Sequence, residues 1–327
     1  MSTRTDGRAV IGVDLGGTKI MTGVVGGDNK ILGRSKRETP AKEGGPAILA
    51  AIIESIDDAL AAARMARTDI AAIGVGSPGP LDPVTGVIRF SANLNVHDFA
   101  LGTDLSAAIG KPVLLQNDVR VGGYGEFKLG AGRGFKNILA AFVGTGIGGC
   151  IVIDGKVLDG STGNAGEVGH MIVRAGGPKC GCGARGCMES LASRTAIAKR
   201  IAKAAKRGMP STLAGKVEKK SGRLKSKDLA AAFNEGDAVT LREVHRAAHY
   251  LGLGLGSLVN VLGPEIVIVG GGVTEALGEP WMELIRLSAR RQILVDPDSK
   301  IKIEAAALGD DAGLLGASLL ARERFAS

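Results

Sequence analysis

Twice in this chain of 327 residues, an apolar run that reads as a buried strand enters a glycine-rich turn and continues directly into another strand. The first instance covers residues 9–25 and turns at Gly16 and Gly17, and the second covers residues 137–154 and turns within residues 144–149. Helical sequence follows each one: an amphipathic helix is predicted over residues 47–66 after the first, and helices over residues 193–206 and 227–261 after the second. The repeated order predicts two α/β domains with a cleft between them.

Composition narrows the class of protein. Hydrophobic residues make up 45% of the chain, which predicts a folded globular protein. The net charge is +8, with basic residues concentrated between Lys199 and Lys227, but aromatic residues are only 3% and none interleaves that run. We interpret the run as a solvated helical hairpin and not as a nucleic-acid surface. No signal peptide or membrane-spanning run is visible, so we expect a cytoplasmic protein with no membrane partner.

The first glycine turn, Asp14-Leu15-Gly16-Gly17-Thr18-Lys19, has the composition of a phosphate-binding loop. Its glycines let backbone N–H groups face a phosphate, Thr18 and Lys19 add donors, and Asp14 can hold Mg²⁺. It is not a P-loop, because the spacing differs and a strand follows it instead of a helix. The alternative is an ordinary hairpin turn.

The second turn, Gly144-Thr145-Gly146-Ile147-Gly148-Gly149, formally matches the glycine pattern of dinucleotide-binding proteins. That fingerprint needs a helix after it, and here the strand of residues 150–154 follows. We therefore reject the dinucleotide reading and predict a phosphate-binding hairpin. Gly270, Gly271 and Gly272 follow another buried strand and could bring a third stretch of backbone close to a nucleotide.

Asn117 and Asp118 follow the apolar run Val-Leu-Leu-Gln at a strand end. A carboxylate at such a position can accept a proton from a substrate hydroxyl during phosphoryl transfer. The alternative is a helix N-cap or an Asx turn, and the residues alone do not separate the two.

Four potential metal ligands lie close together in the sequence, with the spacing His-x9-Cys-x-Cys-x4-Cys: His170, Cys180, Cys182 and Cys187. One imidazole and three thiolates form a closed tetrahedral shell that suits structural Zn²⁺, and Gly181, Gly183 and Gly186 allow tight loops between the ligands. Free thiols beside an unrelated histidine are the alternative. Cys150 lies in a predicted strand and reads as a small core residue.

Glu167 and Glu189 flank this predicted zinc segment. Carboxylates combined with amides such as Asn93 and Asn117 are the usual groups that bind sugar hydroxyls, because they place acceptors and donors at fixed positions. Surface acidity is the alternative interpretation.

Taken together, these motifs resemble the ROK family of sugar kinases and repressors. DLGGTK, GVGSPGP, LQND, GTGIGG, the segment from Glu167 to Glu189 and IVIVGGG occur in family order, over about residues 9–321. The resemblance implies the two-domain actin-like ATPase and sugar kinase fold. It also implies a smaller domain of residues 1–118 plus 308–327 and a larger one of residues 119–307.

The resemblance further implies a role for each motif. Asp118 would be the catalytic base acting on the sugar 6-hydroxyl, and His170 would serve both zinc and sugar. The sugar would be bound by Gly79, Asn93, Asn117, Asp118, Glu167, His170 and Glu189. ATP and Mg²⁺ would be bound by Asp14, Gly16, Gly17, Thr18, Lys19, Gly144, Thr145, Gly146, Gly271 and Gly272. A homodimer or homotetramer is expected.

Overall similarity to bacterial glucokinases favours ATP-dependent phosphorylation of glucose. ROK kinases for fructose, mannose, N-acetylglucosamine or N-acetylmannosamine, or a polyphosphate-using glucokinase, stay open, because pocket shape around the 2-hydroxyl decides specificity. A sugar-responsive repressor is disfavoured, because Asp14 lies too near the first residue for a preceding helix-turn-helix domain and Asp118 is present.

Overall fold

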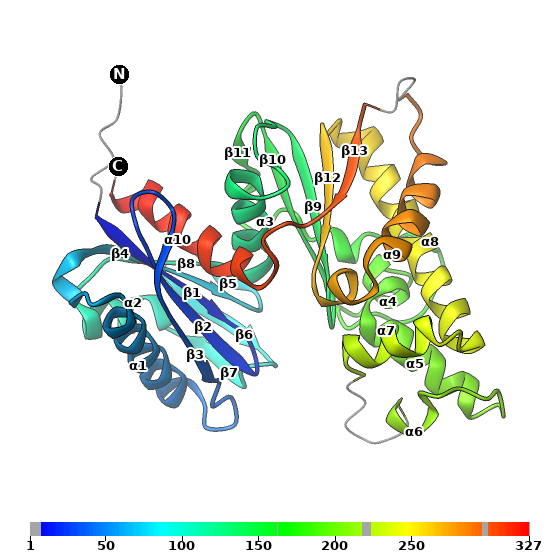
Figure 1. The fold of residues 1–327 in the computed structure, drawn as a ribbon, viewed down its shortest axis with the longest axis horizontal. Coiled ribbons are helices and arrows are strands. Elements are labelled where there is room, and N and C mark those ends of the chain that lie inside the picture. Colours follow the sequence, from blue (N-terminus) through cyan, green and yellow to red (C-terminus); the bar gives the residue numbers. More distant parts are fainter. Residues whose placement is uncertain (1–7, 162, 218–223, 296–299, 327) are drawn as a thin grey trace. The chain divides into compact units, whose positions relative to one another are not determined.

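The computed structural model describes residues 8–161, 163–217, 224–295 and 300–326, and the chain divides into two units (Figure 1). The first unit contains Met1–Arg133, Asp159–Ala165 and Asp310–Ser327, and the second contains Gly134–Leu158 and Gly166–Gly309. These units place helix α3 (Asp118–Leu129) in the first unit, whereas the sequence-based limits assign most of it to the larger domain. Those domain limits stay a prediction.

The first unit is built on a five-stranded sheet in the order β3-β2-β1-β4-β8. The β1–β2 and β2–β3 pairs are antiparallel, and the β1–β4 and β4–β8 pairs are parallel. The strands are β1 (Ala9–Leu15), β2 (Lys19–Val25), β3 (Ile31–Glu38), β4 (Ile70–Ser77) and β8 (Val113–Asn117).

Alternation along these strands sends side chains to opposite faces of the sheet. One face packs on α1 (Gly45–Ala63) through an apolar core that includes Ile11, Val13, Ile48 and Ile52. On the other face α10 (Ala312–Phe325) lies directly on the sheet backbone. A Cβ added at Gly12 would lie 1.9 Å from the Leu314 carbonyl oxygen, so only glycine allows this approach. Helix α3 packs against α10 in turn.

A smaller antiparallel sheet, β5-β6-β7, completes the first unit and carries the loop that contains Asn93. Its strands are β5 (Leu81–Asp82), β6 (Val87–Ser91) and β7 (Val96–Phe99). The remaining elements of this unit are α2 (Leu101–Ile109) and the 3₁₀ turns η1 (Arg67–Asp69) and η3 (Gly309–Asp311), the last of which begins at the unit boundary.

The second unit repeats the first sheet's pattern. Its order is β11-β10-β9-β12-β13, with antiparallel β9–β10 and β10–β11 pairs and parallel β9–β12 and β12–β13 pairs. The strands are β9 (Ile138–Val143), β10 (Ile147–Ile153), β11 (Lys156–Val157), β12 (Ile266–Gly270) and β13 (Lys302–Ala305). The two strand–turn–strand motifs seen in the sequence therefore occupy equivalent places in two sheets of one topology.

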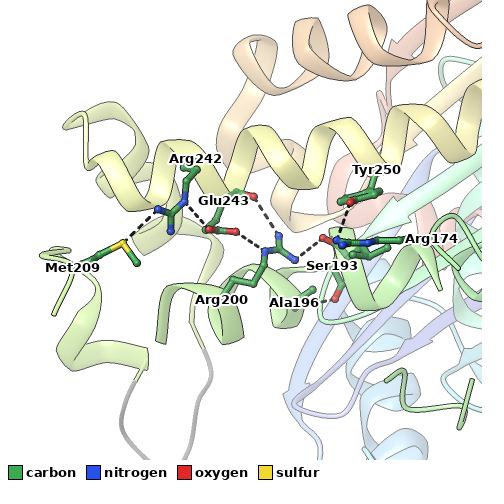
Figure 2. A network of polar contacts seen from close by, with 9 residues as sticks. Arg174, Ser193, Ala196, Arg200, Met209, Arg242, Glu243 and Tyr250 are labelled. Carbon is green, nitrogen blue, oxygen red and sulfur yellow. Dashed lines mark hydrogen bonds and ion pairs between the residues drawn. The ribbon is translucent and has the colours of Figure 1, made fainter. Parts of the chain in front are cut away.

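Helices dominate the rest of the second unit and pack around a core that contains the fully buried Trp281. They are α4 (Met188–Ala192), α5 (Arg194–Ala205), α6 (Ala214–Val217), α7 (Ser226–Asn234), α8 (Ala238–Leu262) and α9 (Gly272–Arg290). Figure 2 shows a polar network that ties α5 to α8. Arg200 Nε donates to Glu243 Oε2 at 2.6 Å, and Arg200 Nη1 donates to the Leu191 carbonyl oxygen of α4 at 2.7 Å.

Most of the helices and strands expected from the sequence form, but one expected element is wrong. Residues 227–261 were expected to be helical throughout, and instead α7 and α8 are separate helices. Gly236 has φ of +79°, and Asp237 caps α8 by accepting the Thr240 N–H at 2.7 Å. Of the basic run, α5 and α6 are helical as expected, while Lys219, Lys220 and Arg223 lie outside the described residues. None of the helices described here combines the length and apolar character needed to cross a membrane.

Candidate functional site

In the first unit the parallel strands β1, β4 and β8 end at one edge of the sheet. Asp14 pairs in register with Gly76 of β4, and Ser77 pairs with Asn117 of β8. Asn117 is the N-cap of α3, because its Oδ1 accepts the N–H groups of Val119 at 3.0 Å and Arg120 at 3.2 Å. The capping alternative is therefore correct for Asn117, and Asp118 is the first residue of the helix.

Asp14 and Asp118 face the same space at this edge. Burial, and after it the negative charge of Asp118, raises the pKa of Asp14 from 3.8 to about 6, although Lys19 opposes the shift. Two carboxylates that destabilise each other's charge are a typical environment for a divalent cation or a proton-transfer group. The edge can therefore hold a cation and accept a proton from a bound hydroxyl.

The first glycine turn is held in place by hydrogen bonds from both sides. The Gly16 N–H donates to the Lys19 carbonyl oxygen at 2.9 Å, and Thr39 Oγ1 donates to the Gly16 carbonyl oxygen at 2.6 Å. Lys19 Nζ pairs with Asp310 Oδ1 at 3.0 Å. The turn thus has a fixed backbone and one cationic side chain beside it.

Asn93 lies close to this turn, and Gly79 lies against the small sheet. A Cβ added at Gly17 would lie 3.0 Å from the Asn93 carbonyl oxygen, so the glycine turn touches the β6–β7 loop directly. Gly79, with φ of +104°, packs against the Phe90 carbonyl oxygen and Ser91 of β6. The first unit therefore brings together Asp14, residues 16–19, Asn93, Asn117 and Asp118, with Gly79 alongside β6.

The four predicted metal ligands cluster in the second unit. The ligand atoms of His170, Cys180, Cys182 and Cys187 all lie within 4.8 Å of one another. His170 Nδ1 is 3.6 Å from Cys180 Sγ, and Cys182 Sγ is 3.7 Å from Cys187 Sγ. Tetrahedral zinc with Zn–S of about 2.3 Å and Zn–N of about 2.0 Å puts neighbouring ligands about 3.5–3.8 Å apart. The donor set and its spacing fit structural Zn²⁺.

The surroundings of the three cysteines shift their pKa values in different directions. Burial raises the pKa of Cys180 to about 12 and also raises the pKa of Cys187, whereas the Ala184 N–H lowers the pKa of Cys182. Thiolates must form for zinc to bind, so metal binding would release protons from this cluster. The segment is braced on α8, where Arg174 Nη1 donates to Tyr250 Oη at 3.2 Å (Figure 2).

Glu189 links the cysteine cluster to the second glycine turn. Its Oε2 accepts the Ile147 N–H at 3.0 Å, and its Oε1 lies 3.6 Å from Cys180 Sγ. Glu167 is exposed and precedes the 3₁₀ turn η2 (Val168–His170), where its carbonyl oxygen accepts the His170 N–H at 3.0 Å. The two glutamates therefore flank the cluster in space as they do in sequence.

The second glycine turn connects β9 to β10, and the third glycine run lies beside it. Gly271 has φ of +86°, and a Cβ there would lie 2.7 Å from the Val143 carbonyl oxygen. Gly271 and Gly272 are thus adjacent to residues 144–146, as a shared binding site requires. The residues that support these turns are not marked by any local sequence motif: Thr39, Arg194, Thr195 and Ser226.

The sequence model of the ROK family matches residues 10–324. The chain belongs to the ROK family. The glucokinase of Halalkalibacterium halodurans is 35% identical over 318 residues, which cover 97% of this chain and 96% of that protein.

Solved ROK structures agree with this assignment. The ROK hexokinase of Thermus thermophilus matches with a TM-score of 0.83 and 38% identity, covering 97% of this chain and 98% of that one. A ROK family glucokinase from Streptomyces griseus, solved in complex with glucose and AMPPNP, matches with a TM-score of 0.81 and 34% identity, covering 96% of this chain and 99% of that one. The predicted family and α/β sugar kinase fold are confirmed. The roles of individual residues in this ROK protein stay predictions.

Proposed function

We propose that this protein is an ATP-dependent hexose kinase that phosphorylates glucose at the 6-hydroxyl. The observation that carries the proposal is the Asp14–Asp118 pair at the end of parallel strands, beside the glycine turn of residues 16–19. Full-length similarity to glucokinases, including one whose structure contains glucose and AMPPNP, supports the choice of sugar and phosphoryl donor.

Asp118 would act as the catalytic base. Its carboxylate would accept the proton of the sugar 6-hydroxyl as that oxygen attacks the γ-phosphorus, and its main effect would be to orient the nucleophile. Its place as the first residue of α3 gives the carboxylate a rigid support. The remaining sugar hydroxyls would be bound by Gly79, Asn93, Asn117, Glu167, His170 and Glu189.

The glycine turns would bind ATP. Backbone N–H groups of Gly16, Gly17, Gly144 and Gly146, with Thr18, Lys19 and Thr145, would contact phosphates, and Gly271 and Gly272 would lie near the nucleoside. Mg²⁺, when bound with the nucleotide, neutralises phosphate charge, and Asp14 is the group that would hold it. The raised pKa of Asp14 fits this role, because a nearby cation favours its ionised form.

Zinc would have a structural role. Its four protein ligands leave no open position for substrate, so it would fix the conformation of residues 167–189. Because Glu189 joins the cluster to the Ile147 N–H, a fixed cluster would also fix the second glycine turn. We further propose a cytoplasmic homodimer or homotetramer with no nucleic-acid or membrane partner, and the domain limits given above.

A coupled assay of ADP release over a panel of hexoses tests the proposal. We expect the highest kcat/KM with glucose, and activity with ATP that polyphosphate does not replace. A preference for fructose, mannose or an N-acetylated hexosamine would show that glucose is not the main substrate. A preference for polyphosphate would show that ATP is not the main phosphoryl donor. Absence of turnover with every sugar and donor, in zinc-replete protein, would reject a kinase and leave a sugar-binding regulator.

A further inference from the structure

Arg194, at the start of α5, connects segments of the second unit that are far apart in sequence. Its Nη2 donates to Thr145 Oγ1 at 2.7 Å in the second glycine turn, and its Nη1 donates to Ser226 Oγ at 2.9 Å at the start of α7. Its backbone N–H also donates to the Gly144 carbonyl oxygen at 3.0 Å. The guanidinium is therefore fixed at both ends beside the turn.

These contacts close into a ring that includes residues predicted to bind nucleotide. A Cβ added at Gly272 would lie 3.4 Å from Ser226 Oγ, so Ser226 touches the third glycine run. Gly271 in turn packs on the Val143 carbonyl oxygen, one residue before the second turn. The ring thus joins residues 143–145, Arg194, Ser226 and residues 271–272.

The direction of the hydrogen bond to Thr145 has a chemical consequence. A guanidinium can only donate, so Thr145 Oγ1 accepts from Arg194 and keeps its own proton for another acceptor. A hydroxyl oriented in this way can donate to a phosphate oxygen, and the adjacent positive charge strengthens that interaction. Such an arrangement is set before the ligand arrives, which reduces the cost of ordering on binding.

We propose that Arg194 is a positioning residue for the phosphoryl donor, a nucleoside triphosphate. It orients the Thr145 hydroxyl and keeps the second glycine turn in register with Gly271 and Gly272. The proposal rests on the proposed function and adds to it a residue to which no role has been assigned. It predicts an effect on nucleotide affinity and none on sugar affinity, because none of the contacts of Arg194 described above involves a residue predicted to bind sugar.

The first test compares Arg194→Gln with Lys199→Gln, which removes the same charge from an exposed position of the same helix. We expect Arg194→Gln to raise the KM for ATP, and the Kd for ADP measured by calorimetry, about ten- to hundredfold, with the KM for glucose within about twofold of wild type. Lys199→Gln should match wild type. An unchanged ADP Kd in Arg194→Gln overturns the proposal, as does a parallel loss of Tm, sugar affinity and nucleotide affinity.

The second test is a double-mutant cycle with Thr145→Val. If Arg194 acts through the Thr145 hydroxyl, the double variant should have about the same ADP Kd as the single variant with the higher Kd. Additive losses would show that the two residues act independently and would overturn the positioning role. ADP binding can be measured without turnover. Wild-type protein that binds ADP but phosphorylates no hexose would therefore reject the proposed function while the cycle still decides the role of Arg194.

Discussion

The two units share one sheet topology but support their glycine turns with different chemistry. In both units, a strand–turn–strand motif supplies two neighbouring strands of the sheet. In both, a threonine hydroxyl donates to a carbonyl oxygen of the turn: Thr39 to Gly16 at 2.6 Å, and Thr195 to Thr145 at 2.7 Å. The turn of the first unit lies beside two carboxylates, Asp14 and Asp118. The turn of the second lies beside Arg194 and Glu189, and Glu189 also contacts the cysteine cluster.

This difference separates two tasks that a phosphoryl-transfer enzyme has to perform. Paired carboxylates destabilise a fold unless a cation or a proton compensates their charge. Their presence in the first unit therefore indicates a site for a cation or for proton transfer. In the second unit, a zinc-bound cysteine cluster and Arg194 would hold the backbone in place and exchange no proton with a substrate, so this unit would serve as a rigid holder of ligand. Under the proposed function, the same sheet topology would support a reactive edge in one unit and a binding edge in the other.

The largest effect should come from the carboxylate at the reactive edge. We expect Asp118→Asn to lower kcat about a thousandfold, because the amide cannot accept the hydroxyl proton, while its oxygen still accepts the Val119 N–H as Asp118 Oδ1 does. Glucose affinity by calorimetry and Tm should stay close to wild type. Glu189→Gln is the matched change in the second unit and should cost kcat far less. Near-normal turnover in Asp118→Asn would remove the distinction between the two edges.

The next effect concerns stability and is confined to the second unit. We expect Cys187→Ala to lose the bound zinc, about one ion per chain, and to lower the free energy of unfolding by about 4 kcal/mol or more, because a structural metal contributes directly to folding. Hydrogen exchange should quicken in α4 and the loop before it, and stay slow in α3 and α10 of the first unit. Elemental analysis and exchange mass spectrometry measure both effects.

Cys150→Ala is the control for that change, since Cys150 is equally buried but lies in β10 outside the cluster. It should keep its zinc. Zinc content that is unaffected by Cys187→Ala, or full activity after the metal has been removed, would contradict a structural zinc site.

A pH-dependent effect should follow at Asp14. Its pKa is raised from 3.8 to about 6, so the folded state binds a proton more tightly than the unfolded state. The stability that this proton contributes is present below pH 3.8 and is lost as the pH rises through about 6, so ionised Asp14 destabilises the fold at neutral pH by about 2–3 kcal/mol. Asp14→Asn should therefore raise stability at pH 7.5, raise it less at pH 4.5, and lower kinase activity.

Denaturant unfolding in Mg²⁺-free buffer at the two pH values measures this effect. Asp310→Asn is a suitable control, because Asp310 makes the smallest contribution to the shift and pairs with Lys19. If Asp14→Asn were less stable than wild type at both pH values, Asp14 would be a structural residue and not a group held ready for a cation.

The sequence predicted the parts of each site that are local. Glycine turns between strands, the cap residue Asn117 and the closely spaced ligands of the cluster are all encoded within a few residues, so pattern and spacing reveal them. The break between α7 and α8 was also readable in principle, because Gly236 and Asp237 are a helix stop followed by a helix cap. Helical sequence lies on both sides of these two residues, which is why a single helix is predicted when the end signals are ignored.

The supporting residues could not be found in this way, because their partners are distant in sequence. Thr39 reaches a turn 23 residues away, and Arg194 joins partners 49 and 32 residues away. Neither residue type is unusual at its position. The strands β6 and β7 were missed for a different reason: they are short, and their burial does not alternate cleanly. Tertiary contacts therefore define the outer part of each site.

The smallest predicted effect is the one that tests the comparison most directly. Thr39→Val and Thr195→Val remove equivalent hydroxyl donors from the two turns and keep side-chain size. Each removes one hydrogen bond worth about 1 kcal/mol, so each should raise the KM for ATP about fivefold. Equal effects would show that both turns contact the phosphoryl donor. If only Thr195→Val weakened ATP binding, the second turn alone would hold the nucleotide, and the first turn would serve the Asp14–Asp118 edge instead. Stopped-flow measurement of ATP binding, with Thr103→Val as an exposed control on α2, distinguishes these outcomes, because Thr103 Oγ1 donates only to a carbonyl oxygen at its own helix start.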